Sequence, residues 1–189
     1  KNHLHLIVSL LNLQAAYAGG AAYRERFIES RNRVASMALA HEELYRANDL
    51  ASVNVADYVE RLARKLVQAS VDTDVELALD LPPLFLPVSA AIPCGLVLNE
   101  LVTNAIKHAF PDRDAGRVTI AARRDGRLVE MRVTDDGVGL PQDFDPAGGA
   151  TLGMQLVGSL VAQLGGRLDV ASGTAGASFV MRFEENEAE

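Results

Sequence analysis

The sequence has one cysteine, no tryptophan and few aromatic residues, with Phe, Tyr and Trp together making up 5% of the chain. A single thiol excludes an intramolecular disulfide and a cysteine-rich zinc site. Cys94 lies in the apolar stretch "IPCGLVL", where we expect a buried and unreactive side chain. Because aromatic residues are scarce, we expect an aliphatic core.

Basic residues are also fewer than acidic ones: the chain has 18 Lys and Arg and 25 Asp and Glu, which gives a net charge of -7. A nucleic-acid surface needs clustered basic residues, so nucleic acid is not an expected partner. The sequence has no signal peptide and no uninterrupted apolar run of about 18 residues, and we therefore expect a cytoplasmic protein without membrane contact. Lys1 lies inside a helical pattern, so we expect the sequence to be part of a longer chain.

The 189 residues, 49% hydrophobic and 23% charged, have a globular composition and open with two helical patterns. A first helix is predicted at 1–17 and ends at "AGG", and a second is expected at about 21–48. We expect His41 on the apolar face of the second helix and its arginines, including Arg33, mostly facing water. Two such helices form an antiparallel hairpin. Its apolar band is too broad for two helices to bury, so we expect dimerisation into a four-helix bundle.

The remaining residues combine helical and strand patterns. A helix is predicted at about 55–69, after a capping residue at Asn54. Alternation then predicts one single strand and two strand pairs: 75–81, 117–124 with 128–135, and 167–172 with 178–183. A further helix is predicted between the two pairs, at 154–164. This order indicates an α+β domain with helices on one face of a mostly antiparallel or mixed sheet, and we expect two domains, 1–52 and 53–189.

One predicted helix carries unexpected polar groups. "NELVTNAIKHAF" at 99–110 places Glu100, Asn104, Lys107 and His108 opposite an apolar stripe. Such a face is most often ordinary solvated surface, so this helix by itself does not identify a site.

Two glycine-rich stretches follow it. "DDGVGLP" at 135–141 ends a strand and turns through two glycines, so that Asp135 could accept a hydrogen bond from an exocyclic amine. "GGATLGMQLV" at 148–157 runs from a loop into a helix, whose first backbone N–H groups favour phosphate. Each stretch alone is common, and only their order and spacing after 99–110 are specific.

In that order the three stretches resemble the N box and the two glycine boxes of the ATP-binding domain shared by sensor histidine kinases, gyrase-type topoisomerases, heat-shock chaperones and mismatch-repair proteins. The N-terminal part resembles the dimerisation and phosphoacceptor hairpin of the type-2 histidine kinases, relatives of the HWE kinases, whose Trp-centred motif is missing here. The resemblance implies a helical hairpin followed by an α+β sandwich ATPase domain. It also implies a two-component histidine kinase core, which transfers the γ-phosphate of ATP to a histidine and then to an aspartate of a response-regulator receiver domain.

The resemblance also implies roles for the polar helix. Asn104 would coordinate Mg2+, a hard cation that prefers oxygen ligands, and Glu100 would polarise a magnesium-bound water or the attacking group. Lys107 and His108 would lie near the phosphate chain, and Asp135 would bind the adenine amino group.

The glycine boxes receive roles in the same way. Gly137 and Gly139 would make room for the adenine ring. Leu152, Gly153 and neighbouring backbone N–H groups would hold the phosphates under a lid formed by about residues 142–152.

Two departures from the family pattern concern this site. The family's acceptor histidine typically precedes the "KN" of the first helix by about one turn, so the acceptor is expected upstream of Lys1, with His3 and His5 as possible substitutes. Ala177 stands where many relatives have Thr, so a polar contact near adenine is either lost or supplied by Thr174 or Ser178.

Three alternatives remain open at this point. One is a histidine phosphotransfer protein with a degenerate kinase-like domain, although a degenerate domain need not retain all these motifs together. Another is a serine kinase of the anti-sigma-factor type or a different ATPase of the same fold, which leaves the hairpin unexplained. The last is a plain structural bundle.

Overall fold

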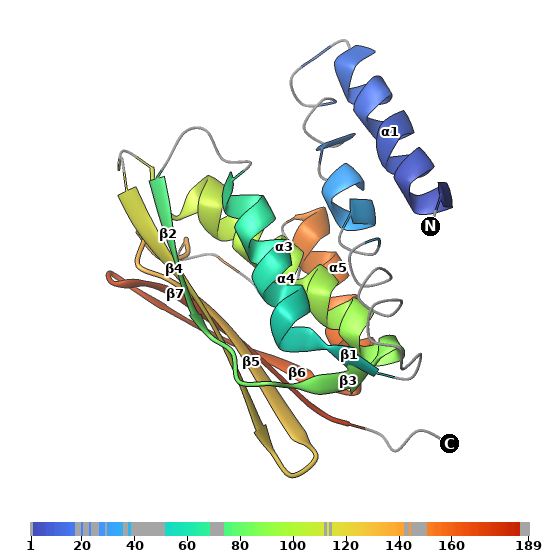
Figure 1. Ribbon diagram of the computed structural model, residues 1–189. Helices are drawn as coiled ribbons and strands as arrows, with labels where there is room; N and C mark the ends of the chain where they lie inside the picture. Colours follow the sequence, from blue (N-terminus) through green and yellow to red (C-terminus); the bar gives the residue numbers. More distant parts are fainter. Residues whose placement is uncertain are drawn as a thin grey trace.

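The computed structural model describes residues 2–17, 20, 23, 27–28, 30–35, 38, 52–68, 74–111, 113, 115–141, 144 and 151–185. The helices in chain order are α1 (Asn2–Tyr17), α3 (Val55–Gln68), α4 (Val88–His108) and α5 (Leu152–Gln163). The strands are β1 (Ser52–Asn54), β2 (Asp74–Asp80), β3 (Phe85–Pro87), β4 (Ala115–Asp125), β5 (Leu128–Asp135), β6 (Arg167–Gly173) and β7 (Gly176–Glu184). Figure 1 shows the helices on one side and the main sheet on the other.

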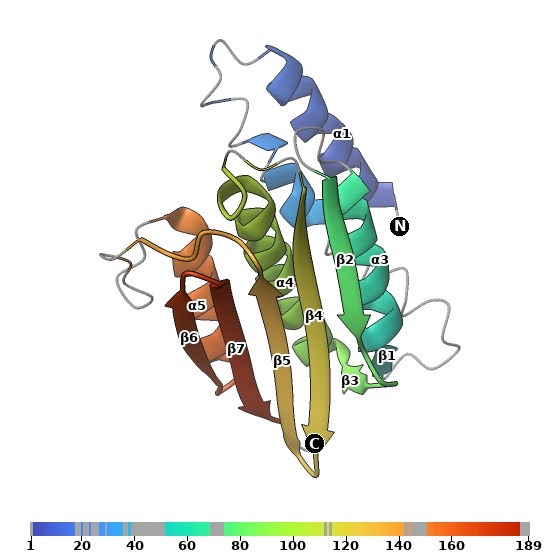
Figure 2. The ribbon, with the colours of Figure 1, turned by 90° about the vertical axis from the view of Figure 1, so that its left-hand side faces the viewer.

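The main sheet has five strands in the order β2-β4-β5-β7-β6, which Figure 2 shows face on. The pair β2–β4 is parallel, and the pairs β4–β5, β5–β7 and β6–β7 are antiparallel. The mixed sheet expected from the sequence is therefore confirmed. A second, two-stranded sheet, β1 paired antiparallel with β3, was not predicted, because three-residue strands carry too little pattern.

The core lies between the sheet and α3, α4 and α5. On β4 and β5 every second side chain is buried, including Val118, Ile120, Val129 and Met131, as expected for a sheet that covers a core on one face. Asn54 caps α3 as predicted, with its Oδ1 accepting from the Ala56 backbone N–H at 3.2 Å.

The central helix α4 extends the helix expected at 99–110 back to Val88 and contains Pro93. Its length and hydropathy alone, within the described part of the chain, would suit a membrane span, but 72% of that apolar window is buried in the fold. Cys94 is fully buried, and burial raises the pKa of its thiol above the usual range. The expectation of a buried cysteine is thus confirmed. A Cβ on Gly95 would meet the Tyr58 hydroxyl oxygen at 1.9 Å, so glycine lets α3 and α4 pack closely.

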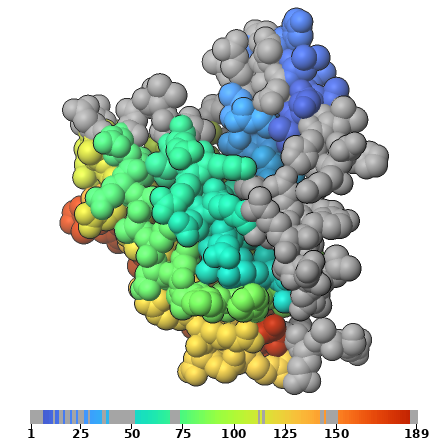
Figure 3. All heavy atoms as spheres, in the orientation of Figure 1, coloured from blue at the N-terminus to red at the C-terminus, as the bar shows by residue number. Residues whose placement is uncertain are grey.

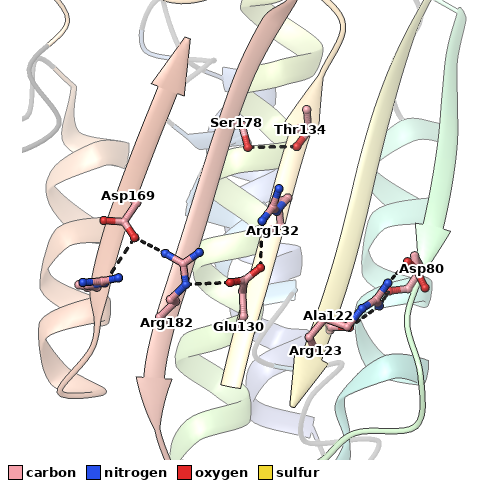
Figure 4. Close-up of polar contacts among 10 residues, drawn as sticks. Asp80, Ala122, Arg123, Glu130, Arg132, Thr134, Asp169, Ser178 and Arg182 are labelled. Atoms are coloured by element: carbon pink, nitrogen blue, oxygen red, sulfur yellow. Dashed lines mark hydrogen bonds and ion pairs between the residues drawn. The ribbon is translucent and has the colours of Figure 1, made fainter. Parts of the chain in front are cut away.

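The outer face of the sheet carries a cross-strand series of ion pairs, drawn in Figure 4. Arg182 on β7 lies between Glu130, 2.7 Å away on β5, and Asp169 on β6. At the other edge Arg123 pairs with Asp80, and its hydrogen bond lowers the pKa of that carboxyl. Exposed pairs of this kind contribute about 0–1 kcal/mol each, so their main role is to keep this face polar.

The described part of the N-terminal region contains α1 and helical residues at 27–28 and 30–35, consistent with the expected hairpin. In Figure 3 the described hairpin residues project beyond the end of the helical layer. Large apolar side chains on α1 are exposed in this single chain, with Leu10 at 53%, Leu13 at 58% and Tyr17 at 82%. His41 and most of the second helix lie outside the described residues.

Candidate functional site

Two adjoining cavities open between α4, α5 and the ends of β5 and β7. The larger has a volume of about 510 Å³ and mostly apolar walls, and the smaller has about 110 Å³ and polar walls. Asn104, His108 and Thr151 line both cavities. The two cavities therefore form one elongated site with an apolar end and a polar end.

Asp135 is the buried acidic group of the apolar end. It is the last residue of β5 and is 7% exposed, and its Oδ1 accepts from the backbone N–H groups of Gly137 at 3.0 Å and Ala177 at 3.2 Å. Oδ2 has no hydrogen-bond partner among the described residues. Asp135 thus offers the larger cavity a fixed hydrogen-bond acceptor.

Asp136, the residue after Asp135, has a structural role instead. Asp136 Oδ1 accepts from the Arg117 backbone N–H at 2.8 Å, and this bond lowers the pKa of the Asp136 carboxyl, helped by Arg113. Asp136 does not line either cavity. Its hydrogen bond to Arg117 holds the loop after β5 against β4, whereas Asp135 lines the larger cavity.

The two glycines of this loop also differ. Gly139 lines the larger cavity and has a φ of 79°, which favours glycine. Gly137 does not line it, and a Cβ there would meet the Ala109 carbonyl oxygen at 2.1 Å. The expectation that Gly137 makes room for a ring is therefore wrong, because its lack of a side chain makes room for the end of α4.

Apolar side chains complete the wall of the larger cavity. Phe144 and Phe179 meet edge to face, with ring centroids 6.2 Å apart. Met154 lies opposite, and its sulfur accepts from the Asn104 side-chain amide at 3.6 Å. A flat apolar ligand would fit such a wall, since ligand sites combine apolar lining with a few polar groups.

Of the three residues considered for a polar contact near the ring, only Ala177 lines this cavity. Ser178 Oγ lies 3.2 Å from Thr134 Oγ1 on the outer face of the sheet (Figure 4), because successive residues of a strand point to opposite faces. Thr174 is exposed in the turn between β6 and β7. Neither residue replaces the side chain missing at Ala177, so the expectation that Thr174 or Ser178 supplies this contact is wrong, and its loss is the alternative that remains.

The start of α5 forms one wall of the polar cavity. Thr151 is the N-cap of this helix, and its Oγ1 accepts from the Met154 N–H at 3.3 Å. Leu152 and Gly153 form the first turn and line the cavity, and the Leu152 side chain is largely exposed. The first N–H groups of a helix have no partner within the helix and carry its positive dipole end, which suits an anion.

The opposite wall is the polar face of α4. Glu100 and Asn99 are buried, whereas Lys107 and His108 are exposed at the end of the helix. The buried Thr103 hydroxyl lines this cavity and has no hydrogen-bond partner among the described residues. This unpartnered polar atom is a further sign that a polar ligand belongs here.

A contact from the hairpin reaches the same wall. Arg33 donates from Nε to Glu100 Oε1 at 2.7 Å and from a terminal nitrogen to Oε2 at 2.9 Å. The side chain of Arg33 is 16% exposed. The expectation that Arg33 mostly faces water is therefore wrong. Helical periodicity could not predict this contact, because its partner lies 67 residues away in the chain.

The structure thus brings together all but one of the predicted site residues: Glu100, Asn104, Lys107, His108, Asp135, Gly139, Leu152 and Gly153. Gly137 supports the site from outside it. The cap at Thr151 and the ring of Phe144 were missed, although the "T" before "LGMQ" was a readable cap signal. Most of the expected lid, 142–143 and 145–150, lies outside the described residues.

The oxygen donors suit magnesium. Asn104 and Glu100 lie one helical turn apart and both line the polar cavity. Mg2+ is usually held by one or two protein oxygens together with phosphates and waters. The described residues contain no group of three or more His, Cys, Asp and Glu placed to hold a metal.

Two protein-family models match this chain. Residues 1–70 match one described as "Histidine kinase", and residues 90–187 match one described as "Histidine kinase-, DNA gyrase B-, and HSP90-like ATPase". Together they cover the hairpin and nearly all of the site.

Individual relatives agree with these matches. The sensor histidine kinase PdtaS of Mycobacterium tuberculosis is 40% identical over 171 residues, which are 89% of this chain and 34% of the relative. Blue-light-activated histidine kinase 2 of Erythrobacter litoralis is 31% identical over 181 residues, which are 93% of this chain and 52% of the relative. The chain thus spans about a third to a half of the length of these relatives.

A solved structure has the same fold. The histidine kinase domain of the Erythrobacter litoralis EL346 blue-light activated histidine kinase superimposes with a TM-score of 0.79 at 30% identity. The alignment covers 97% of this chain and 86% of that domain. It includes both the hairpin and the sheet domain.

Proposed function

Since this chain belongs to the sensor histidine kinase family, with a type-2 hairpin before a histidine kinase-, gyrase- and Hsp90-like ATPase domain, we propose that it binds Mg-ATP and transfers the γ-phosphate to a histidine. The phosphoryl group then passes to an aspartate on a response-regulator receiver domain. The observation that carries the proposal is the pairing of an apolar cavity that contains Asp135 with a polar cavity at the start of α5.

The two ends of the site suit the two ends of a nucleotide. The apolar end offers Phe179 and Met154 to the faces of the adenine ring and Asp135 to its amino group. The polar end offers backbone N–H groups around Gly153 to the phosphates. Asn104, which lines both ends, is the proposed magnesium ligand.

Catalysis of phosphoryl transfer depends mainly on positioning the reacting groups and neutralising the charge of the phosphates. The bond between the γ-phosphorus and its bridging oxygen breaks as the bond to a histidine nitrogen forms, and ADP leaves. Glu100 is the proposed base that accepts a proton from the attacking imidazole or orients it. Bound magnesium supplies charge neutralisation along the phosphates, and Lys107 adds to it from the end of α4.

The acceptor histidine is proposed to precede Lys1. His3 and His5 are the substitutes within this chain, and both lie on α1, where their side chains are outside the described part. Phosphate label on His3 or His5 would identify that residue as the acceptor and would contradict the proposed upstream position.

The hairpin is proposed to form a homodimer. Leu10, Leu13 and Tyr17 expose large apolar surface on α1, and a four-helix bundle would cover it. Domains at 1–52 and 53–189 remain the proposal. The pairing of β1 with β3 starts at Ser52, which supports a boundary one residue earlier than proposed. A cytoplasmic location follows from the proposed use of ATP and of a receiver domain.

The test is calorimetric titration of the chain with a non-hydrolysable ATP analogue, with and without Mg2+, beside Asn104→Ala and Asp135→Asn. We expect binding that depends on magnesium and is lost or strongly weakened in both variants. Lack of binding by the unchanged chain would refute the proposal and favour a phosphotransfer protein with a degenerate domain.

A further inference from the structure

The ion pair between Arg33 and Glu100 joins the hairpin to the nucleotide site. Both oxygens of Glu100 accept from Arg33, at 2.7 and 2.9 Å, and Oε1 also accepts from the Asn99 side-chain amide at 3.1 Å. The two paired side chains are 16% and 8% exposed. A two-pronged, largely buried contact of this kind is among the stronger ion pairs in proteins.

The pair lies at the polar end of the site. A Cβ on Gly153 would come within 2.6 Å of Glu100 Oε2, so this oxygen faces the start of α5. Asn32, the neighbour of Arg33, lines the polar cavity. Figures 1 and 2 both place the light-blue hairpin segment at this end of the helical layer. The hairpin therefore forms part of the wall of the polar cavity, where the phosphates are proposed to bind.

The pair restricts what Glu100 can do. Each of its two oxygens already accepts a hydrogen bond from the guanidinium of Arg33. A histidine N–H approaching Glu100 would have to replace a guanidinium N–H. Loss of Arg33 would leave both oxygens of Glu100 open to such a donor.

We propose that Arg33 is a positioning residue that acts through Glu100, withholding this carboxylate from the reacting group until the hairpin helix that carries Arg33 moves. The inference rests on the proposed function. Because the contact joins the hairpin to α4, across 67 residues of the chain, the conformation of the hairpin becomes a determinant of the rate of phosphoryl transfer.

The first test measures transfer from γ-labelled ATP in a chain extended upstream to include the acceptor, for Arg33→Ala, Arg33→Lys and the control Arg64→Ala. Arg64 forms an exposed pair with Glu60, and neither residue lines either cavity. We expect Arg33→Ala to raise the maximal rate on the order of tenfold, a common size for coupling between sites, with the KM for ATP unchanged. Arg33→Lys should give an intermediate rate, because a lysine ammonium cannot donate to both oxygens of Glu100 in the bidentate geometry of arginine.

A rate in Arg33→Ala that is equal to or below that of the unchanged protein, with ATP affinity retained, would overturn the inference. A higher maximal rate at an unchanged KM for ATP is a result that a purely structural role of Arg33 would not produce.

A second test does not depend on nucleotide chemistry. Spin labels at Gln14→Cys on α1 and Ser159→Cys on α5, two exposed positions, report the distance between hairpin and ATPase domain, and buried Cys94 stays unlabelled. Labelled protein is diluted with unlabelled protein to remove distances between copies. We expect Arg33→Ala to broaden or shift the distance distribution. An unchanged distribution would refute the contact, whereas a change without any ATP binding would refute only the proposed function.

Discussion

Replacing Asp135 with Asn separates the ligand-binding role of this side chain from its structural role. The Oδ1 acceptor for the Gly137 and Ala177 N–H groups is retained in Asn, so the thermal midpoint should change little. The second oxygen becomes an NH2 group, which faces the adenine amino group donor to donor. Loss of one hydrogen bond to a charged acceptor costs about 1.5–3 kcal/mol, which corresponds to an affinity about 10- to 150-fold weaker.

The assay is calorimetric titration with a magnesium–ATP analogue, accompanied by thermal unfolding of each variant. Asp136→Asn is the matched control, because it is the adjacent residue with the same chemical change, and it keeps its acceptor for the Arg117 N–H. Asp136→Asn should bind like the unchanged protein. Unchanged affinity in Asp135→Asn, or an equal loss in both variants, would refute the assignment of Asp135 to the adenine amino group.

Three further predictions concern stability and assembly. Gly137→Ala should lower the thermal midpoint by several degrees, because its Cβ would lie 2.1 Å from the Ala109 carbonyl oxygen; an unchanged midpoint would contradict this packing. The folded-state pKa values of Asp80 and Asp136 lie below their ordinary values, so their stabilisation is present above about pH 4 and is lost as pH falls through the folded values. Urea unfolding from pH 6 to pH 3 should show a smaller loss of stability in a variant with both residues changed to Asn, and an equal loss would contradict it. Leu13→Asp on α1 should convert the proposed dimer to a monomer by light scattering, and a dimer that persists would place the interface elsewhere.

Much of the fold could be predicted from the sequence because its signals are local. Alternation located β4 and β5, and the Asn54 cap located the start of α3. The parallel pairing of β2 with β4 could not be read, because strand order depends on contacts between segments far apart in the chain. Pro93 inside α4 opposed a helix there, and burial of the surrounding apolar residues overrides that preference.

The same distinction holds for the site. Asn104 and Asp135 could be assigned because short motifs surround them, and the structure brings both to one elongated cavity. Gly137 belonged to the same motif, yet only the position of Ala109 shows that it serves packing. The prediction for Arg33 was wrong because its partner lies 67 residues away in the chain. An arginine with such a distant partner has the same periodicity as one that faces water.

If one nucleotide spans both cavities, amide chemical-shift mapping on addition of a magnesium–ATP analogue will detect it at both ends of the site. We expect large shifts at Gly139 and Ala177, at the apolar end, and at Gly153, at the polar end, with the outer-face residues Arg123 and Glu130 unchanged. Shifts confined to one cavity or to the outer face of the sheet would contradict it.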